Sequence, residues 1–411
     1  MPHDIIRLQN GLRLVHKELD APISHFGVLV NAGTRDESEA QMGMAHFVEH
    51  TIFKGTTKRN AFRVISRMEA VGGDMNASTS KEETYFHTSF QSQDYPRAVE
   101  LLSDIFFNAT FPERELEKEK TVILEEINYY KDSPSELIFD DFEDLVFSGH
   151  PLGKNILGTR QSVKRMKRES LLSFIAQNYT LDNVVLSSVG RIPTKRLVNL
   201  CERYFGSRPM VESTRVRTPF GQYRPQTRMV RKNTAQTHVM MGNVAYSIRD
   251  DRRVPFLLLT NLLGGQGMNT RLNMSLREKQ GLAYTVEANY TPFSDTGLFS
   301  IFFGCDPHNR DHCMELVDRE LRKVRQQKLG TMQLYYAQKQ LIGQMALSNE
   351  TKLNEMLALG HTALFFDEVD TLEESIAEIR EITSDEICRV ANEIFQRDDF
   401  SVLFFDPARV A

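Results

Sequence analysis

Hydrophobic positions in the first half of the chain follow two patterns: short runs or alternation typical of strands, and the 3.6-residue spacing typical of helices. Asn10-Gly11 lies between two apolar runs, and this turn predicts a β-hairpin over residues 8–19. Short apolar or alternating runs predict further strands at 25–31 and 84–90. Apolar residues at helical spacing predict a helix that begins near Met42 and helices over 62–70 and 95–107. The first half is therefore expected to mix strands and helices.

The second half repeats this order after a stretch rich in Pro and Arg at residues 207–232. Its patterns are strand-like at 238–242 and 297–304 and helical at 254–263 and 308–327. This recurrence indicates a duplicated unit of about 200 residues. We expect an α+β fold of two duplicated domains, each a mostly antiparallel sheet with helices packed on one face. The expected domains are 1–210 and 233–411, joined by a linker at 211–232.

The composition is that of a globular protein, with 41% hydrophobic and 26% charged residues among 411. That length corresponds to two or three domains. The formal net charge of -5 argues against nucleic acid bound through a dominant basic surface. No run reaches the roughly 18 apolar residues that a membrane span requires. Neither nucleic acid nor a membrane is therefore an expected partner.

The four cysteines are scattered and form no CxxC pair, which is typical of a protein in a reducing compartment. The N-terminal residues include Asp4 and no apolar stretch of signal-peptide length. These features favour a cytoplasmic protein. A periplasmic or organellar location stays open if a precursor segment is removed before this numbering begins.

The segment His46-Phe47-Val48-Glu49-His50 lies in an apolar stretch with helix-forming character. Positions i and i+4 of a helix project from the same face, so both imidazoles can reach one metal ion. Glu49 lies beside them, where its carboxylate can take a proton from a water on the metal. This H-x-x-E-H order is the inverzincin signature of zinc peptidases. The alternative is two helix histidines in ordinary hydrogen bonds.

A third ligand is expected from the helical pattern of residues 112–132. At 100° per residue, Glu119 and Glu126 fall on the apolar side of this helix, whereas Glu125 faces solvent. A carboxylate that faces a core is costly unless it is paired or bound to metal. We assign Glu126 as the third ligand and Glu119 as a carboxylate that orients a ligand or the water. The ordinary alternative is two acids at the edge of the stripe; if Glu126 is not the ligand, Glu119 or Glu125 is next.

A second pair of histidines, His308 and His312, has the same i, i+4 spacing. Its neighbours are polar, and Asp306 followed by Pro307 is typical of the start of a helix. We therefore expect an exposed first turn there, without a metal ion.

Further motifs extend the match beyond the pentapeptide. The chain resembles the family of pitrilysin, insulin-degrading enzyme and mitochondrial processing peptidase over nearly its whole length. The motifs that carry the resemblance are AGTRDE (32–37), GMAHFVEHTIFKGT (43–56), GGDMNASTS (72–80), EKTVILEEI (119–127), HPLGKNILGT (150–159), YTLDNVVLSSVG (179–190) and GMNTRLNMSLREKQGLAYTV (267–286).

The resemblance implies a half-length member in which two chains close into a chamber, most simply as a homodimer. The first domain is then the zinc-binding catalytic domain, with one Zn²⁺ per chain. Asn76 and Ala77 match an edge strand that binds the substrate backbone, although Asn76 by itself also suits a turn. Arg277 and Tyr284 match a pair that contacts the substrate carbonyl near the scissile bond. Without the resemblance they suit a surface arginine and a half-buried tyrosine.

The expected function is a zinc-dependent endopeptidase that hydrolyses unfolded peptides by zinc-activated water, with Glu49 as general base. One alternative is a non-catalytic scaffold subunit, which intact His46, His50 and Glu126 argue against. Another is the catalytic subunit of a heterodimeric peptidase, which intact Arg277 argues against. A different divalent metal also suits two His and one Glu. The sequence does not identify the physiological substrate.

Overall fold

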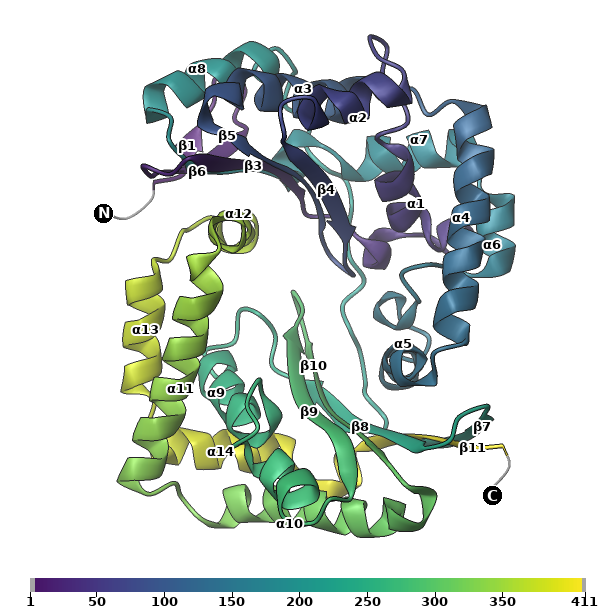
Figure 1. Cartoon of the computed structure of the whole chain (residues 1–411), viewed down its shortest axis with the longest axis vertical. Coiled ribbons are helices and arrows are strands. Elements are labelled where there is room, and N and C mark those ends of the chain that lie inside the picture. Colours follow the sequence, from purple (N-terminus) through teal and green to yellow (C-terminus); the bar gives the residue numbers. More distant parts are fainter. Residues whose placement is uncertain (1–3, 409–411) are drawn as a thin grey trace. The chain divides into compact units, whose positions relative to one another are not determined.

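Residues 4–408 are described by the computed structural model (Figure 1). They form two compact units, each built around one β-sheet. Unit 1 comprises the chain up to Ile127 with Lys154–Arg217 and Ala346–Thr371. Unit 2 comprises Asn128–Gly153, Thr218–Met345 and the chain from Leu372 onward.

The sheet of unit 1 has the strand order β1-β2-β6-β3-β5-β4. The pairing of β2 with β6 is parallel and the other pairings are antiparallel. β4 therefore lies at one edge, paired on one side only with β5. The strands are β1 (Ile6–Arg7), β2 (Arg13–Glu18), β3 (Ile23–Val30), β4 (Asp74–Thr79), β5 (Thr84–Gln91) and β6 (Val184–Gly190).

The sheet of unit 2 has the order β7-β11-β8-β10-β9, again with one parallel pairing, between β7 and β11. Matching β2–β6 to β7–β11 in chain order reproduces the arrangement of the first sheet strand for strand. The duplication predicted from the sequence is therefore present in the topology. The strands are β7 (Thr227–Lys232), β8 (Thr237–Ala245), β9 (Ala283–Pro292), β10 (Gly297–Cys305) and β11 (Ser401–Pro407).

Helices cover both faces of the first sheet. α3 and α8 contact one face, and Phe26 of β3 lies against Phe205 there. α12 covers the opposite face, where the Met356 carbonyl accepts a hydrogen bond from Ser187 Oγ at 2.6 Å. The helices of this unit are α1 (Met44–Thr51), α2 (Ala61–Glu69), α3 (Tyr95–Asn108), most of α4 (Glu113–Lys131), α6 (Arg160–Arg165), α7 (Arg168–Asn178), α8 (Thr194–Tyr204) and α12 (Lys352–Phe366).

The second sheet is covered in the same way. α9, α10 and α14 enclose a core on one face that includes Phe299 and Ile301. α5 covers the other face, where Phe142 packs with Met240 and Leu403. The helices of this unit are α5 (Pro134–Val146), α9 (Arg253–Gly264), α10 (Arg310–Gln326), most of α11 (Thr331–Glu350), α13 (Leu372–Glu381) and α14 (Ser384–Ile394).

The predicted α+β class with mostly antiparallel sheets is confirmed, but helices lie on both faces of each sheet and not on one. The additional layer is α12 in unit 1 and α5 in unit 2. Each comes from the half of the sequence that builds the other sheet, so neither unit is contiguous, unlike the expected ranges 1–210 and 233–411. Burial of every residue of β6 and β10 reflects this covering, because a strand with one solvated face alternates between buried and exposed positions.

The expected linker at 211–232 is divided between the two units. Arg217 donates to both Asp36 carboxylate oxygens at 2.9 Å, and Arg215 lies 3.2 Å from the same group. Asp36 is buried, so these pairs attach the first part of the segment to unit 1. Its last residues form β7 of the second sheet.

Candidate metal centre

The H-x-x-E-H segment forms α1, a short helix that packs against β4 and α7. Met44 to Val48 are buried, which explains the apolar residues around the histidines. His46 and His50 lie one turn apart with ring centroids 4.5 Å from each other. The helical spacing therefore brings both imidazoles to one side, as predicted.

α4 presents the predicted apolar stripe to unit 1. Leu116, Ile123 and Ile127 are buried, as is Glu119, whereas Glu125 on the other side is exposed. The Glu126 side chain is 31% exposed and lies at the margin of the stripe. The helical period thus identified the two acids that face α1.

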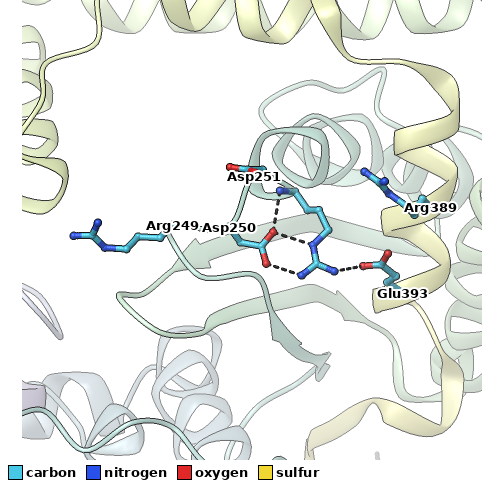
Figure 2. A pocket seen from close by; sticks show the side chains of 6 residues that line it. Arg249, Asp250, Asp251, Arg389 and Glu393 are labelled. Carbon is cyan, nitrogen blue, oxygen red and sulfur yellow. Dashed lines mark hydrogen bonds and ion pairs between the residues drawn. The ribbon is translucent and has the colours of Figure 1, made fainter.

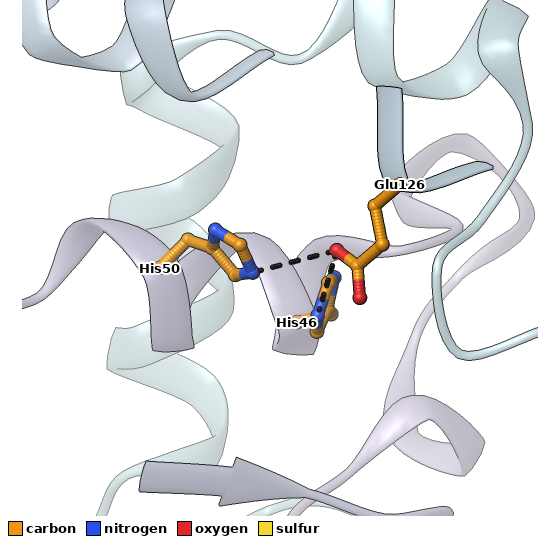
Figure 3. Close-up of side chains that lie close together, drawn as sticks. All are labelled: His46, His50 and Glu126. Atoms are coloured by element: carbon orange, nitrogen blue, oxygen red, sulfur yellow. Dashed lines mark ion pairs between the residues drawn. The ribbon is translucent and has the colours of Figure 1, made fainter. Parts of the chain in front are cut away.

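His46, His50 and Glu126 converge from α1 and α4 (Figure 3). Glu126 Oε2 lies 3.7 Å from Nε2 of both histidines, and the three ligand atoms lie within 4.8 Å of one another. Ligand atoms of a tetrahedral zinc ion, at about 2.1 Å from the metal, are separated by about 3.4 Å. Among residues 4–408, this is the one group of three His, Cys, Asp or Glu side chains close enough to share a metal ion.

The charges around this group also suit a divalent cation. Glu49, Glu119 and Glu126 contribute three carboxylates, and Lys54 contributes one ammonium group. Burial raises the pKa of Glu126, and the negative charge of Glu49 raises it further against the opposing effect of His50. A bound cation relieves such repulsion between carboxylates. The donor set and its charge therefore fit zinc.

Glu119 connects His50 to Lys54. Its Oε2 lies 3.2 Å from His50 Nδ1 and its Oε1 lies 2.7 Å from Lys54 Nζ. An Nδ1–H that donates to this carboxylate leaves the lone pair of His50 on Nε2, the atom that faces Glu126. The carboxylate thereby selects the tautomer that can bind the metal.

His46 is held differently from His50. Burial, with the charge of His50, lowers the pKa of His46 to about 3. The imidazole is therefore neutral at physiological pH, as a ligand must be. Its Nδ1 is buried and has no hydrogen-bond partner among the described residues. The ring is therefore oriented by its packing and by Glu126, which lies 3.7 Å from Nε2.

Glu49 is largely enclosed between α1 and β4. Burial raises its pKa, while the Thr79 side chain and the charge of His50 oppose the rise. A carboxylate with a raised pKa is a better proton acceptor than an ordinary one, which suits a general base.

Three nearby residues were not identified from the sequence. Lys54 lies in the turn after α1, beyond the end of the helix at Thr51, so the helical spacing was no signal for it. Thr79 comes from β4 and Glu37 from the loop after β3, and no local pattern indicated either of them. Glu37 accepts hydrogen bonds from the N–H groups of Gly43 and Ala45, both at 2.8 Å.

The expected substrate-contacting residues are divided between the two units. Asn76 and Ala77 are on edge strand β4, and Asn76 Oδ1 accepts a hydrogen bond from the Ala77 N–H at 2.8 Å. Arg277 lies on the π-helical turn Asn273–Glu278 of unit 2, and Tyr284 is on edge strand β9. The Arg277 guanidinium carbon lies 5.5 Å from the centre of the Tyr284 ring, and Tyr284 is 77% exposed.

The second histidine pair, His308 and His312, lies at the start of a helix. Asp306 accepts a hydrogen bond from the His308 N–H at 2.9 Å, and Pro307 is the first residue of the following turn, as predicted. His312 lies 3.1 Å from Gln280 Oε1, and its side chain is 47% exposed.

A separate pocket of about 470 Å³ lies in unit 2 (Figure 2). It is lined by Arg249, Asp250, Asp251, Arg252, Arg389 and Glu393. The Arg252 guanidinium donates hydrogen bonds to Asp250 at 2.6 Å and to Glu393 at 2.7 Å. Its positive charge is therefore paired with carboxylates of the pocket itself.

Comparison with known proteins identifies the family. Residues 13–160 match the family described as "Insulinase (Peptidase family M16)", and residues 165–341 match "Peptidase M16 inactive domain". The chain is 30% identical over 402 residues to the uncharacterized zinc protease YmxG of Bacillus subtilis, covering 97% of each chain. The chain belongs to peptidase family M16. An uncharacterized zinc protease of Mycobacterium tuberculosis is 33% identical over 395 residues, which are 95% of this chain and 90% of that protein.

Solved structures show the same M16 fold. A protease from Helicobacter pylori superposes with a TM-score of 0.92 at 21% identity, covering 99% of this chain and 100% of the other. A protein from Pseudomonas fluorescens, described as a peptidase M16 inactive domain, has a TM-score of 0.92 at 19% identity, covering 100% and 99%. In this M16 chain, no helix of residues 4–408 has the length and apolar character of a membrane span.

Proposed function

We propose that this M16 chain is a zinc-dependent endopeptidase with one catalytic zinc ion per chain. The observation that carries the proposal is the convergence of His46, His50 and Glu126, with Glu49 beside them on α1. The zinc proteases among its relatives support the choice of metal. The metal-binding residues lie in the half that matches the insulinase domain, and the half that matches the inactive domain contributes none of them.

When bound by these residues, zinc acts as a Lewis acid toward a water molecule and the peptide carbonyl. Glu49 accepts a proton from the attacking water and later delivers it to the leaving amine. Its burial between α1 and β4 keeps the carboxylate short of solvent and favours proton transfer. Glu119 holds His50 in the tautomer that this chemistry requires.

Arg277 and Tyr284 are proposed to contact the substrate carbonyl. The Tyr284 hydroxyl is on an exposed side chain and can donate to the negative charge that develops on the carbonyl oxygen. The guanidinium group of Arg277 beside the ring adds positive charge at the same place.

Edge strand β4 is proposed to bind the substrate backbone by strand addition. β4 pairs with β5 on one side, which leaves its other edge to accept an extended peptide at Asn76 and Ala77. The Asn76 side chain occupies the Ala77 N–H and must release it for a peptide to pair there. Unfolded peptides inside a closed chamber are the expected substrates, because a folded protein offers no free strand.

The proposed assembly is a homodimer in which each zinc site uses Arg277 and Tyr284 of the partner chain. Both the zinc ligands and the substrate-contacting pair are present in one sequence, so two identical chains suffice for two complete sites.

The decisive experiment compares Glu49→Gln with the wild type. The variant should keep about one zinc per chain by metal analysis and lose at least ~100-fold in cleavage of an unfolded peptide, since general-base catalysis is typically worth 10²–10⁴. A chelator should abolish wild-type cleavage, and added zinc should restore it. Full activity of Glu49→Gln, or wild-type protein without zinc, would refute the proposal.

A further inference from the structure

The metal helix α1 begins without a cap of its own. The first N–H groups of a helix have no partner inside the helix, and a side chain at the preceding residue usually supplies one. In α1 that position is Gly43, which has φ of +86° and no side chain. A Cβ atom at this position would lie 2.7 Å from the Leu157 carbonyl oxygen. A capping side chain therefore cannot be placed at residue 43.

Glu37 supplies the missing partner from outside the helix. Its Oε2 accepts a hydrogen bond from the Gly43 N–H and its Oε1 from the Ala45 N–H, both at 2.8 Å. Glu37 is 4% exposed. A buried carboxylate is costly unless it is hydrogen bonded, so its place at this helix end indicates a specific role. Burial raises the pKa of the Glu37 carboxyl to about 8, and the hydrogen bonds from these two N–H groups oppose the rise.

The loop that carries Glu37 is itself firmly held. The N–H groups of Thr34 and Arg35 donate to the carbonyls of Ser80 and Lys81 at 3.2 and 2.7 Å. The buried Arg35 guanidinium also donates to Glu82 at 2.7 Å. The position of Glu37 is thus set by the loop that carries it and not by the helix that it caps.

The position of α1 decides the geometry of the metal ligands. Ala45 directly precedes His46, and α1 has only eight residues, so a shift of its first turn moves the imidazole of His46. The Nδ1 atom of that imidazole has no hydrogen-bond partner among the described residues. Metal–ligand distances must be met within about 0.2 Å.

We propose that Glu37 is a positioning residue of the metal centre, which holds the first turn of α1 so that His46 and His50 face Glu126. This inference rests on the proposed function, in that these three residues hold the zinc. Glu37 touches neither the metal ligands nor the substrate and acts through the backbone of α1.

The test uses Glu37→Gln and Glu37→Ala, with Glu355→Gln as a matched control. Glu355 is also a buried glutamate of unit 1, but it lies on α12 and is paired with Lys17 of β2 and Lys352 of α12. The first readout is hydrogen–deuterium exchange of peptides that cover residues 42–47 in the metal-free protein. Both Glu37 variants should exchange these amides at least ~10-fold faster, and the control should not.

The second readout is the metal site itself. The dissociation constant for Zn²⁺, measured by competition with a chelator, should rise about 10-fold in Glu37→Gln and more in Glu37→Ala, the range found for lost orienting partners of ligands. The visible absorption of bound Co²⁺ should change in both variants and stay unchanged in the control.

Wild-type zinc affinity and an unchanged Co²⁺ spectrum in Glu37→Ala would overturn the inference, as would unchanged exchange of residues 42–47. If Glu37→Ala does not fold, Glu37→Gln decides by the same criteria. Absence of zinc from the wild-type protein refutes the proposed function as well. If the wild type and both Glu37 variants bind zinc equally well, the role of Glu37 is refuted and the proposed zinc site stands.

Discussion

Replacement of Glu119 tests how far the metal centre depends on the residues behind its ligands. The Glu119 side chain is 10% exposed and joins His50 Nδ1, at 3.2 Å, to Lys54 Nζ, at 2.7 Å. Glu119→Ala removes the acceptor that selects the His50 tautomer. It also leaves the Lys54 ammonium group near the metal site without this carboxylate.

The expected loss follows from these two contacts. Removal of the hydrogen-bond partner of a ligating histidine typically costs 10–100-fold in metal affinity, or about 1.4–2.7 kcal/mol. Glu119→Gln keeps one carbonyl oxygen that can accept from His50, but it loses the charge and puts an NH2 donor in place of the oxygen that faces Lys54. About 10-fold weaker zinc binding is therefore expected. Glu119→Ala loses both the acceptor and the charge that balances Lys54. Its zinc affinity should fall by about 100-fold.

The assay is competition for Zn²⁺ with a chelator of known affinity, alongside thermal unfolding of the metal-free proteins. Glu117→Gln is the control on the same helix, since the Glu117 side chain is 69% exposed and pairs with Lys120 away from α1. Zinc affinity within twofold of the wild type in folded Glu119→Ala would refute the role assigned to Glu119. An equal loss in Glu117→Gln would indicate a general effect of charge on α4.

Three further predictions concern the ligand, the assembly and the effect of pH. Glu126→Ala should lose zinc by metal analysis, whereas Glu125→Ala should keep it, because Glu126 lies with the two histidines and Glu125 is exposed on the other side of α4. Inactive Glu49→Gln and Arg277→Ala homodimers should regain roughly a quarter of wild-type cleavage after subunit exchange, since half of the dimers then hold one complete site. Burial, with the charge of His87, lowers the pKa of His25 to about 4 from 6.5. The free energy of unfolding should therefore fall as the pH drops from 6.5 toward 4, because the unfolded chain takes up the proton first. The fall should be less steep in His25→Gln.

Each of these predictions can be contradicted by a specific result. Zinc retained in Glu126→Ala would move the third ligand to another carboxylate. No recovery of cleavage, with exchange confirmed by native mass spectrometry, would mean that Arg277 serves its own chain or takes no part in catalysis. The pH prediction is measured by urea unfolding at pH 7.5 and 5, and the same loss of stability in His25→Gln and the wild type would remove His25 as its source.

Local sequence patterns were sufficient to identify the elements that carry the three proposed metal ligands. The spacing of His46 and His50 places both on one side of any helix, whatever that helix packs against. The same reasoning separated Glu119 and Glu126 from Glu125, because a period of 3.6 residues decides which side chains share a face. Both conclusions depend only on the geometry of a single helix.

The packing of α5 and α12 could not be obtained in this way. Their apolar faces show that each helix is buried, but either sheet could have provided the surface that buries it. Because α5 covers the second sheet and α12 the first, neither compact unit is a contiguous stretch of the chain. The second helical layer, which buries every residue of β6 and β10, was accordingly not predicted.

The sequence by itself therefore determined the α+β class, the duplication and the ligand-bearing faces of two helices, since these depend on periodicity along the chain. Only the tertiary structure decided that these faces meet, that Lys54 bonds to Glu119, and that Glu37 caps α1. Such contacts join residues that are far apart in sequence or on different elements. A hydrophobic pattern reports that a side chain is buried, whereas the identity of its neighbours depends on how the whole chain packs.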